Sequence, residues 1–389
     1  MTIPDSTTGF TATDHAMMAR ALRLAERGAF TTKPNPMVGC VVARGDEVVG
    51  EGWHQRAGGP HAEVLALQAA GDNARGATVY VTLEPCSHVG KTGPCADVLI
   101  AAGVTHVVGA MRDPNPLVDG AGFKRLQSEG IIVETGLMEA FARQLNRGFL
   151  SRIERGRPWM RIKLAISLDG RSALASGESK WISGEPARRD VQRWRARSGA
   201  ILTGAGTVLI DDPLLTVRLG DDTPEYERDF VPPLRVVLDP GLATVARGRI
   251  REGDAPTLYI HAADARMPRG IDAQHAHVPV HEGRFDLAAV LKLLADRGIN
   301  EVQVEAGATL AGGFLSAGLV DELLLYVAPV ILGERARPMF EGLHIDEMTE
   351  RLCMRIVETR RIGDDVRLLL QPRRDEATHA MDSIAPPRA

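Results

Sequence analysis

The stretch of this chain that most constrains its fold runs from Trp53 to Cys95. A Pro-His-Ala-Glu run places His61 and Glu63 near its start, and Cys86 and Cys95 stand near its end. One imidazole and two thiols are good ligands for a tetrahedral zinc, and three protein ligands leave the fourth position for water, as a catalytic site requires. A chain that uses these ligands must fold so that the two ends of the stretch meet.

Local patterns predict an α/β fold in which helices and strands alternate around a largely parallel sheet. The expected elements of the first half are a helix over 13–28 capped by Thr13, paired strands over 38–44 and 47–50, a helix over 61–70, a strand over 78–83, a helix over 95–102, a strand over 105–111 and a helix ending near 147. Two of these strands deliver Cys86 and Asp113 at their carboxyl ends. Ligands gather at that edge of such sheets, so we expect the two loops to share one site.

The second half is expected to form a different α/β domain, because 389 residues are too many for one hydrophobic core and no internal repeat relates the halves. Its expected elements are strands over 159–167, 200–203, 234–239, 257–261, 301–305, 323–328, 355–359 and 366–370, and helices over 186–198 and 287–297. A charged segment over 151–158 is interpreted as the linker. We therefore predict domains over 12–150 and 158–372, with disordered ends.

Composition argues against several classes of protein. The hydrophobic fraction of 44% and the charged fraction of 25% are typical of a soluble globular protein. A net charge of −4 and an aromatic fraction of 4% favour neither attraction to a nucleic-acid backbone nor base stacking. No apolar run is long enough to span a membrane, and the N-terminal segment lacks the features of a secretory signal.

The four cysteines do not form a secreted disulfide framework. Cys86 and Cys95 belong to the motif, whereas Cys40 and Cys353 stand alone in apolar segments, where we expect ordinary buried thiols. We therefore expect a cytoplasmic protein with reduced thiols. We also expect a homo-oligomer that binds small molecules, and neither nucleic acid nor membrane.

Zinc held by His61, Cys86 and Cys95 would lower the pKa of a bound water to about 7. Cys95 begins a helix, where the helix dipole is expected to lower the pKa of a thiol. Glu63 is then placed to transfer protons, and H-x-E followed by P-C…C is the pattern of the zinc-dependent nucleobase deaminases. The alternative is a structural zinc, which needs a fourth protein ligand, and His88 is the residue available for it.

The spacer between the cysteines indicates a narrower resemblance. Eight residues separate Cys86 from Cys95, where ordinary cytidine deaminases have two. Together with Pro34-Asn35-Pro36, Gly52-Trp53-His54 and Asp113-Pro114-Asn115-Pro116, this segment resembles the bifunctional riboflavin-biosynthesis deaminase–reductases, the RibD family. That family usually has Thr-Pro-Pro-Cys where this chain has Thr92-Gly93-Pro94-Cys95, a change expected to alter loop stiffness more than chemistry.

The resemblance implies a cytidine-deaminase-like α/β/α first domain in which Glu63 is catalytic. The residues that it implies around a pyrimidine and its ribose phosphate are Asn35, His54, His88, Lys91, Asp113 and Asn115. Amide and carboxylate groups suit the donors and acceptors of a diaminopyrimidinone ring, while ammonium and imidazole groups suit a phosphate. The alternative is that the Asn and Asp residues beside prolines only form turns.

The second half has no G-x-G-x-x-G between a first strand and helix, so a Rossmann site is not indicated. A glycine-rich run over 305–313 follows a predicted strand. It would either present backbone N–H groups to a pyrophosphate or form a tightly packed turn. The arginines of the helix over 186–198 form a solvated face, unless one or two of them bind a phosphate.

The ordered motifs of this half resemble the reductase half of the same family, which has a dihydrofolate-reductase-like α/β fold and uses NADPH. They lie at 163–171, 179–183, 194–198, 204–207, 211–218 and 305–313. The positions implied to contact the reductase substrate are Lys163, Ser179, Arg195, Leu215, Arg218 and Glu305. The positions implied to contact NADPH are Ala165, Trp181, Thr207, Asp211, Gly307, Ala308, Thr309, Leu310, Ala311, Gly312 and Gly313.

The resemblance thus implies a two-step enzyme with one zinc ion and NADPH. The first domain would deaminate 2,5-diamino-6-ribosylamino-4(3H)-pyrimidinone 5′-phosphate. The second would reduce the ribosyl side chain to give 5-amino-6-(5-phosphoribitylamino)uracil. Two alternatives stay open: a deaminase of free nucleosides or tRNA whose second domain only binds, and a non-catalytic scaffold stabilised by zinc.

Overall fold

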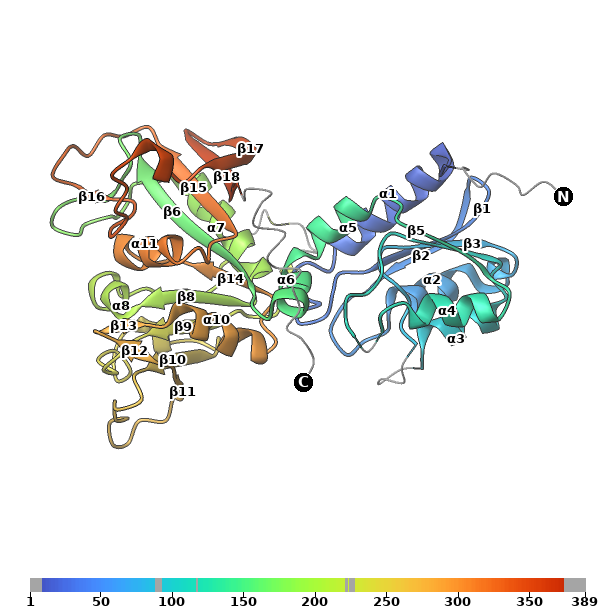
Figure 1. Cartoon of the computed structure of the whole chain (residues 1–389), viewed down its shortest axis with the longest axis horizontal. Coiled ribbons are helices and arrows are strands. Elements are labelled where there is room, and N and C mark those ends of the chain that lie inside the picture. Colours follow the sequence, from blue (N-terminus) through green and yellow to red (C-terminus); the bar gives the residue numbers. More distant parts are fainter. Residues whose placement is uncertain (1–8, 88–92, 117, 221–222, 224–227, 374–389) are drawn as a thin grey trace. The chain divides into compact units, whose positions relative to one another are not determined.

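The computed structural model describes residues 9–87, 93–116, 118–220, 223 and 228–373. Within these residues the chain forms two compact units (Figure 1). The first takes its residues from Met1–Pro158, Asp222–Val231 and Ala295–Asn300, and the second from Trp159–Asp221, Pro232–Leu294 and Glu301–Ala389. Among the described residues, no helix is both long and apolar enough to cross a membrane. Most of the two ends predicted to be disordered lies outside the described residues.

The first unit is a five-stranded sheet with helices on both faces, which confirms the α/β/α architecture predicted for it. Its elements are α1 (Ala12–Glu26), β1 (Gly39–Arg44), β2 (Glu47–Trp53), α2 (Ala62–Ala70), η1 (Gly71–Ala74), β3 (Thr78–Val81), α3 (Cys95–Ala102), β4 (His106–Gly109), α4 (Ala121–Ser128), β5 (Ile132–Thr135), α5 (Glu139–Leu145) and α6 (Arg147–Arg155). The strand order is β2-β1-β3-β4-β5. Strands β3, β4 and β5 are parallel, but β1 is antiparallel to both neighbours, so the sheet is mixed.

Two apolar clusters attach the helices to this sheet. One packs α2, α3 and α4 on the face that carries Val79 and Val107. The other packs α1, α5 and α6 on the face that carries Val41 and Tyr80. Helix α2 lies so close to β2 that a Cβ on Gly52 would stand 2.7 Å from the backbone nitrogen of Ala66. This close approach fixes the start of α2, where the first zinc ligand was predicted.

Two local predictions for this unit were wrong. Helix α1 is capped by Thr11 rather than Thr13, because Thr11 forms a reciprocal capping box with the third residue of the helix. The linker predicted over 151–158 is helical as far as Arg155, because α6 is amphipathic and buries Phe149 in the core. Most of the charged residues that suggested a linker belong to that helix, where Glu154 is exposed and Arg152 and Arg155 are half-buried.

The second unit is built on a nine-stranded sheet in the order β11-β10-β9-β8-β14-β6-β15-β18-β17. Its elements are β6 (Trp159–Ser167), β7 (Arg171–Ala173), α7 (Glu185–Arg197), β8 (Ala200–Gly204), α8 (Ala205–Asp211), β9 (Leu234–Leu238), η2 (Arg249–Arg251), β10 (Thr257–His261), β11 (Gln274–His277), β12 (Val280–His281), β13 (Arg284–Phe285), α10 (Leu287–Asp296), β14 (Glu301–Val304), α11 (Ala308–Ser316), β15 (Glu322–Ala328), β16 (Arg337–Pro338), η3 (Met348–Glu350), β17 (Met354–Ile362) and β18 (Asp365–Pro372). Neighbours from β11 to β15 are parallel, and β18 and β17 continue the sheet antiparallel.

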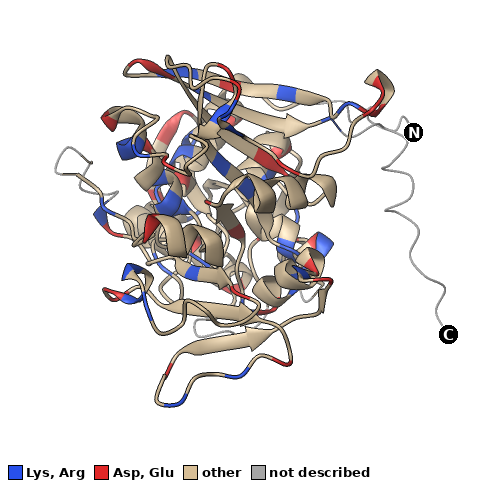
Figure 2. Cartoon of the chain, turned by 90° about the vertical axis from the view of Figure 1, so that its left-hand side faces the viewer, with Lys and Arg blue, Asp and Glu red and all other residues tan. Residues whose placement is uncertain are grey.

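Cys353 is exposed, contrary to the prediction of a buried thiol, because it immediately precedes β17, the outermost strand of this sheet. Cys40 is buried in β1 as predicted. Basic and acidic residues of the described chain are interspersed along the ribbon instead of being gathered by sign (Figure 2).

Helix α7 covers a face of the second sheet that carries charged side chains. Arg161 on β6 is fully buried and pairs with Glu322 at 2.7 Å and with Glu301 at 3.1 Å. Its guanidinium group lies 4.4 Å from the ring centroid of Trp194 on α7. Lys163 is the next residue of β6 on the same face of the sheet. The charged groups on this face therefore form a row that runs towards the carboxyl ends of the strands.

Candidate active sites

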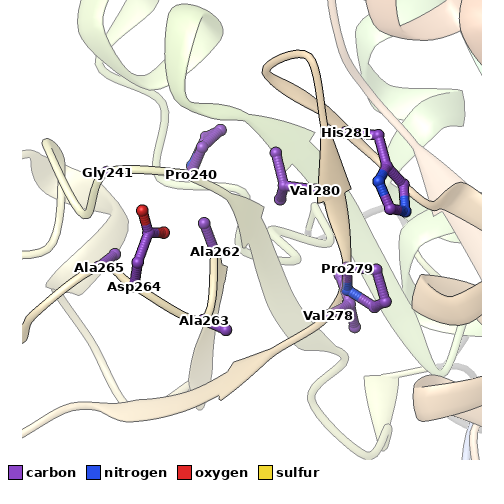
Figure 3. A pocket seen from close by; sticks show the side chains of 10 residues that line it. All are labelled: Pro240, Gly241, Ala262, Ala263, Asp264, Ala265, Val278, Pro279, Val280 and His281. Carbon is purple, nitrogen blue, oxygen red and sulfur yellow. The ribbon is translucent and has the colours of Figure 1, made fainter.

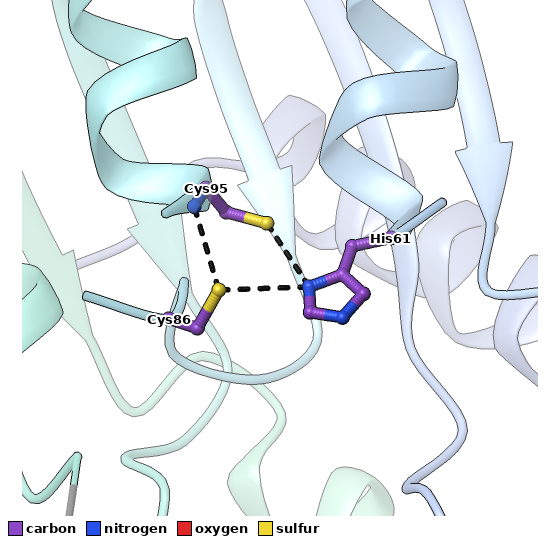
Figure 4. Close-up of side chains that lie close together, drawn as sticks. All are labelled: His61, Cys86 and Cys95. Atoms are coloured by element: carbon purple, nitrogen blue, oxygen red, sulfur yellow. Dashed lines mark hydrogen bonds between the residues drawn. The ribbon is translucent and has the colours of Figure 1, made fainter. Parts of the chain in front are cut away.

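Three side chains converge where the sequence predicted a metal centre (Figure 4). His61 immediately precedes α2, Cys86 follows β3, and Cys95 is the first residue of α3. Their ligand atoms all lie within 4.8 Å of one another. His61 Nδ1 is 3.2 Å from Cys95 Sγ and 3.5 Å from Cys86 Sγ, and the backbone N–H of Cys95 donates to Cys86 Sγ at 3.4 Å.

The chemistry of these donors fits a zinc ion, which prefers sulfur and imidazole ligands in tetrahedral geometry. The thiol of Cys95 donates to Cys86, and this bond, with a further contribution from His61, lowers the pKa of Cys86 to about 4. The same hydrogen bond and burial raise the pKa of Cys95. The two thiols therefore share a proton, and a zinc ion at this site would bind both of them as thiolates.

Glu63 lies in the first turn of α2, two residues after His61, and is only 3% exposed. Burial raises the pKa of its carboxyl group. It also interacts with the thiol of Cys95. A buried carboxyl with a raised pKa beside a metal site can accept and return protons near neutral pH.

Two of the predicted pyrimidine contacts form one unit beside the metal ligands. His54 donates from Nδ1 to the carbonyl oxygen of Pro60 at 3.0 Å, so its Nε2 accepts from the amide of Asn35 at 3.1 Å. Burial lowers the pKa of His54, which favours this neutral form. The His54 ring meets the His61 ring edge-on, with 5.5 Å between centroids.

Asp113 and Asn115 form a turn in which the backbone N–H of Asn115 donates to the Asp113 carboxylate at 2.9 Å. This turn is held by Glu84, a residue that the sequence patterns did not single out. Glu84 is 4% exposed and accepts four backbone N–H groups at 2.9–3.4 Å, those of Asp113, Gly120, Gly122 and Phe123. One carboxylate thus ties the loop that carries Cys86 to the predicted pyrimidine loop. The two remaining predicted contacts, His88 and Lys91, lie outside the described residues.

In the second unit, three of the predicted substrate residues meet on the face covered by α7. The Nε and Nη2 atoms of Arg195 donate to the two carboxylate oxygens of Glu305 at 2.7 and 2.8 Å. Its Nη1 donates to the backbone oxygen of Thr216 at 2.9 Å. Burial raises the pKa of Glu305, but the charge of Arg195 outweighs it and brings the value to about 2. Burial lowers the pKa of Lys163, although the charge of Glu305 opposes this shift. The structure thus pairs two of the residues predicted to contact the reductase substrate, Arg195 and Glu305, with each other.

Arg218, the other arginine predicted to contact the reductase substrate, lies near two further arginines. Burial lowers the pKa of its guanidinium group, and the like charges of Arg195 and Arg249 lower it further. A cluster of like charges is relieved when an anion binds. Ser179 is half-buried, whereas the side chain of Leu215 is 4% exposed and packs in the core, so Leu215 offers a ligand only its backbone.

The predicted NADPH residues gather at the carboxyl ends of adjacent parallel strands. Thr207 and Asp211 lie on α8, directly after β8, and Gly307 caps α11, directly after β14. Residues Gly307 and Thr309 are exposed, and Leu310 and Gly313 are half-buried. The other predicted contacts on that segment, Ala308, Ala311 and Gly312, are buried. A Cβ on Gly312 would stand 1.9 Å from the backbone oxygen of Glu341, so this glycine is required for packing.

Trp181 and Ala165 complete the predicted NADPH contacts. Trp181 is 70% exposed, and the Arg188 guanidinium stacks on its ring at 4.6 Å. Ala165 lies on β6 and is half-buried.

The same edge of the sheet holds a pocket that the sequence patterns did not indicate (Figure 3). It has a volume of about 670 Å³ and is lined by Pro240, Gly241, Ala262, Ala263, Asp264, Ala265, Val278, Pro279, Val280 and His281. These residues follow β9, β10 and β11, so the pocket continues the row of strand ends that begins at β14 and β8. The lining consists mainly of small or apolar side chains, including two prolines, and these form no chemical motif that predicts a pocket from the sequence.

Family models match both halves of the chain. The model described as the cytidine and deoxycytidylate deaminase zinc-binding region matches residues 11–111, and the RibD C-terminal domain matches residues 158–368. The riboflavin biosynthesis protein RibD of Escherichia coli (strain K12) is 49% identical over 362 residues, which cover 92% of this chain and 99% of that protein. The protein of the same name from Haemophilus influenzae is 43% identical over 94% of this chain and 99% of its own length.

Solved structures agree over both units. RibD of Acinetobacter baumannii, in its form 1, superposes with a TM-score of 0.86 at 43% identity, and covers 93% of this chain and 99% of its own. The Thermotoga maritima protein, described as a diaminohydroxyphosphoribosylaminopyrimidine deaminase and 5-amino-6-(5-phosphoribosylamino)uracil reductase, superposes with a TM-score of 0.81 at 32% identity over 92% of this chain and 99% of its own. The deaminase-like metal centre, the reductase-like second unit and these full-length matches have one explanation: the chain belongs to the RibD family of bifunctional riboflavin-biosynthesis enzymes.

Proposed function

We propose that this chain carries out two consecutive steps on a phosphorylated pyrimidine. The first unit replaces the ring amine of 2,5-diamino-6-ribosylamino-4(3H)-pyrimidinone 5′-phosphate with oxygen from water and releases ammonia. The second unit reduces the ribosyl group of the product to give 5-amino-6-(5-phosphoribitylamino)uracil. The observation that carries the proposal is the convergence of His61, Cys86 and Cys95 within 4.8 Å, next to the buried Glu63.

For the deamination we assign the metal to His61, Cys86 and Cys95, and the protons to Glu63. When bound there, zinc would make a water molecule acidic enough to react at neutral pH. Glu63 takes a proton from the attacking water and passes protons to the ring nitrogen and the leaving amine, so that water and substrate yield product and ammonia. Its buried position supports this role, because a carboxyl with a raised pKa returns a proton easily.

We assign the recognition of the pyrimidine to two pairs of residues. Asn35 and His54 are hydrogen-bonded to each other beside His61, and their fixed orientation supports contact with the ring. Asp113 and Asn115 present carboxylate and amide groups from a turn that Glu84 holds in place. We also keep His88 and Lys91 as proposed ligands of the ribose phosphate.

For the reduction we assign the substrate to Lys163, Ser179, Arg195, Arg218 and Glu305, together with the backbone of Leu215. NADPH supplies a hydride when it is bound. Arg195 is held by Glu305 and so orients the site, while Arg218 has the charge environment expected of a phosphate ligand. Lys163 has a pKa lowered by burial, which suits it to give the proton that balances the hydride.

We assign NADPH to the strand ends around Thr207, Asp211 and Gly307–Gly313, with Trp181 and Ala165 at the nicotinamide end. The pocket after β9, β10 and β11 lies on the same edge of the sheet and is large enough for the rest of the dinucleotide. Within the segment, Gly307 and Thr309 are the exposed residues and so the direct contacts.

The test uses the full-length enzyme with zinc and the diaminopyrimidinone phosphate. Ammonia release is followed first, and loss of nicotinamide absorbance is followed after NADPH is added. We expect Glu63→Gln to lower ammonia release by about 10²-fold or more, while the same variant still reduces substrate that has already been deaminated. Ammonia release at the wild-type rate would remove Glu63 from its role. Activity on cytidine but not on the phosphorylated pyrimidinone would favour a nucleoside deaminase.

We expect the enzyme to act in the cytoplasm as a homo-oligomer, and to bind neither nucleic acid nor membrane. Reducing conditions suit the thiol ligands, and the interspersed charges of the described residues favour small phosphorylated substrates over a long phosphate backbone. Sedimentation of the purified chain measures the oligomeric state directly.

A further inference from the structure

A cluster of three histidines that neither proposed reaction uses lies at the edge of the second sheet, on two strands whose following segments line the pocket of Figure 3. His261 ends β10, and His275 and His277 lie two residues apart on the adjacent parallel strand β11. His261 is directly opposite His277 in the register of the two strands. Side chains two residues apart, and side chains of paired residues, lie on the same face of a sheet, so all three imidazoles belong to one face.

Two of these rings already have the separation that a shared metal requires. His261 Nε2 is 3.0 Å from His275 Nδ1. Two nitrogen ligands of a tetrahedral zinc, each 2.0–2.1 Å from the metal, lie about 3.4 Å apart. A cation could therefore take the place of the proton between the two rings if they separated by a few tenths of an ångström.

The buried ring is held in the tautomer that binds metals. His261 is 6% exposed, and its Nδ1 is 2.7 Å from the backbone oxygen of Ala262, to which it must donate. Its Nε2 therefore carries the lone pair, and the proton in the contact between the rings belongs to His275. A histidine that donates one ring N–H to a backbone carbonyl and offers the lone pair of its other nitrogen is the arrangement found at metal ligands.

The third ring is further away, because the nitrogen atoms of the three imidazoles do not all lie within 4.8 Å of one another in the described structure, so His277 must rotate towards His261 to complete the site. The centroids of His261 and His277 are 6.3 Å apart, compared with 5.2 Å for His261 and His275. His275 and His277 are both exposed, so their side chains can rotate and a metal can reach them from solvent. Two histidines in an i, i+2 relation and a third on the neighbouring strand give a three-imidazole set on a rigid sheet.

We propose that His261, His275 and His277 form a second metal site, which takes a divalent d-block cation such as zinc, nickel or copper. Imidazole ligands favour these ions over magnesium or calcium, which prefer oxygen. To bind through Nδ1, neutral His275 moves its single ring proton from Nδ1 to Nε2, so its net charge does not change. The bound ion joins the ends of β10 and β11, and the segments that follow these strands line the pocket of Figure 3.

The experiment loads the full-length chain with Co²⁺ and measures the total metal content and the visible spectrum. Cobalt at the first site shows thiolate-to-metal charge transfer from Cys86 and Cys95, whereas cobalt bound by imidazoles and water shows only d–d bands. We expect a second equivalent of metal per chain with the thiolate-free spectrum. Loss of one imidazole in His275→Ala or His277→Ala should weaken this second equivalent by at least about tenfold, as removal of even an outer partner does at metal sites.

The matched control is His344→Ala, which removes an exposed histidine outside the cluster and should leave the second equivalent unchanged. His275 and His277 are exposed, so their variants test the site even if His261→Ala fails to fold. The proposal is overturned if wild-type chain binds metal only with thiolate charge transfer, or if the second equivalent binds equally well to both exposed-histidine variants. None of these readouts depends on either catalytic activity.

Discussion

The carboxylate of Glu84 is predicted to control substrate affinity in the first unit without touching substrate. The perturbation is Glu84→Gln, which keeps the size of the side chain but replaces one acceptor oxygen with an N–H₂ donor. In the structure one oxygen accepts from Gly122 and Phe123, and the other accepts from Asp113 and Gly120. Glutamine can satisfy one of these pairs, and its amide nitrogen must then face the other two N–H groups.

The magnitude follows from the two hydrogen bonds that are lost. Hydrogen bonds to charged groups contribute about 1.5–3 kcal/mol each, so we expect the free energy of unfolding of the first unit to fall by about 3 kcal/mol or more. If the lost bonds include that of Asp113, the predicted pyrimidine loop is held less firmly. We expect KM for the diaminopyrimidinone phosphate to rise about tenfold, equivalent to about 1.4 kcal/mol, with a smaller change in kcat.

Steady-state ammonia release gives kcat and KM, and urea unfolding gives stability. The zinc content and the reductase activity of the same chain are internal controls, and both should be unchanged. Asp239→Asn is the matched variant, because Asp239 is also buried and also accepts backbone N–H groups, those of Ala243 and Thr244, but in the second unit. The reasoning is refuted if KM of Glu84→Gln stays within twofold of wild type, or if Asp239→Asn raises the deaminase KM equally.

Two further predictions concern the second unit. The pKa of Glu305 is about 2 in the folded chain, against an ordinary value of 4.5, so its ionised form stabilises the fold above pH 4.5, and this contribution is lost as the pH falls towards 2. The difference in free energy of unfolding between wild type and Glu305→Gln should therefore be constant from pH 7 to about 5 and shrink below 4.5; a difference that persists unchanged at pH 2.5 contradicts this. Arg218→Ala should raise KM for the phosphorylated reductase substrate by about 10–100-fold and leave KM for NADPH unchanged, because a charge-assisted contact with phosphate is lost. Arg189→Ala, which removes an exposed arginine paired with Glu185, is its control, and equal effects of the two changes would rule out a phosphate role for Arg218.

The metal centre could be predicted because its signals are local. His61 precedes a helix with clear apolar spacing, and Cys86 follows a short β-branched strand, so the ends of two predictable elements carry the ligands. Pro94 caps the helix that begins with Cys95, as its preference for a helix start predicts. Local signals did not predict α6, because its charged residues outnumber the apolar residues that show helical spacing. These charged residues suggested a linker, although Phe149 of the same helix packs in the core.

The partners of the site residues could not be predicted, because they come from distant parts of the chain. The N–H groups bound by Glu84 lie 29 to 39 residues further on, and nothing in the Glu84-Pro85-Cys86 sequence specifies them. Arg195 illustrates the consequence. Its sequence position indicated a contact with substrate, but nothing in the sequence indicated that Glu305, 110 residues away, binds its guanidinium group, or that Arg218 lies near the like charges of Arg195 and Arg249. A motif therefore identifies which residues can do the chemistry, whereas the folded chain decides which of them remain available to the substrate.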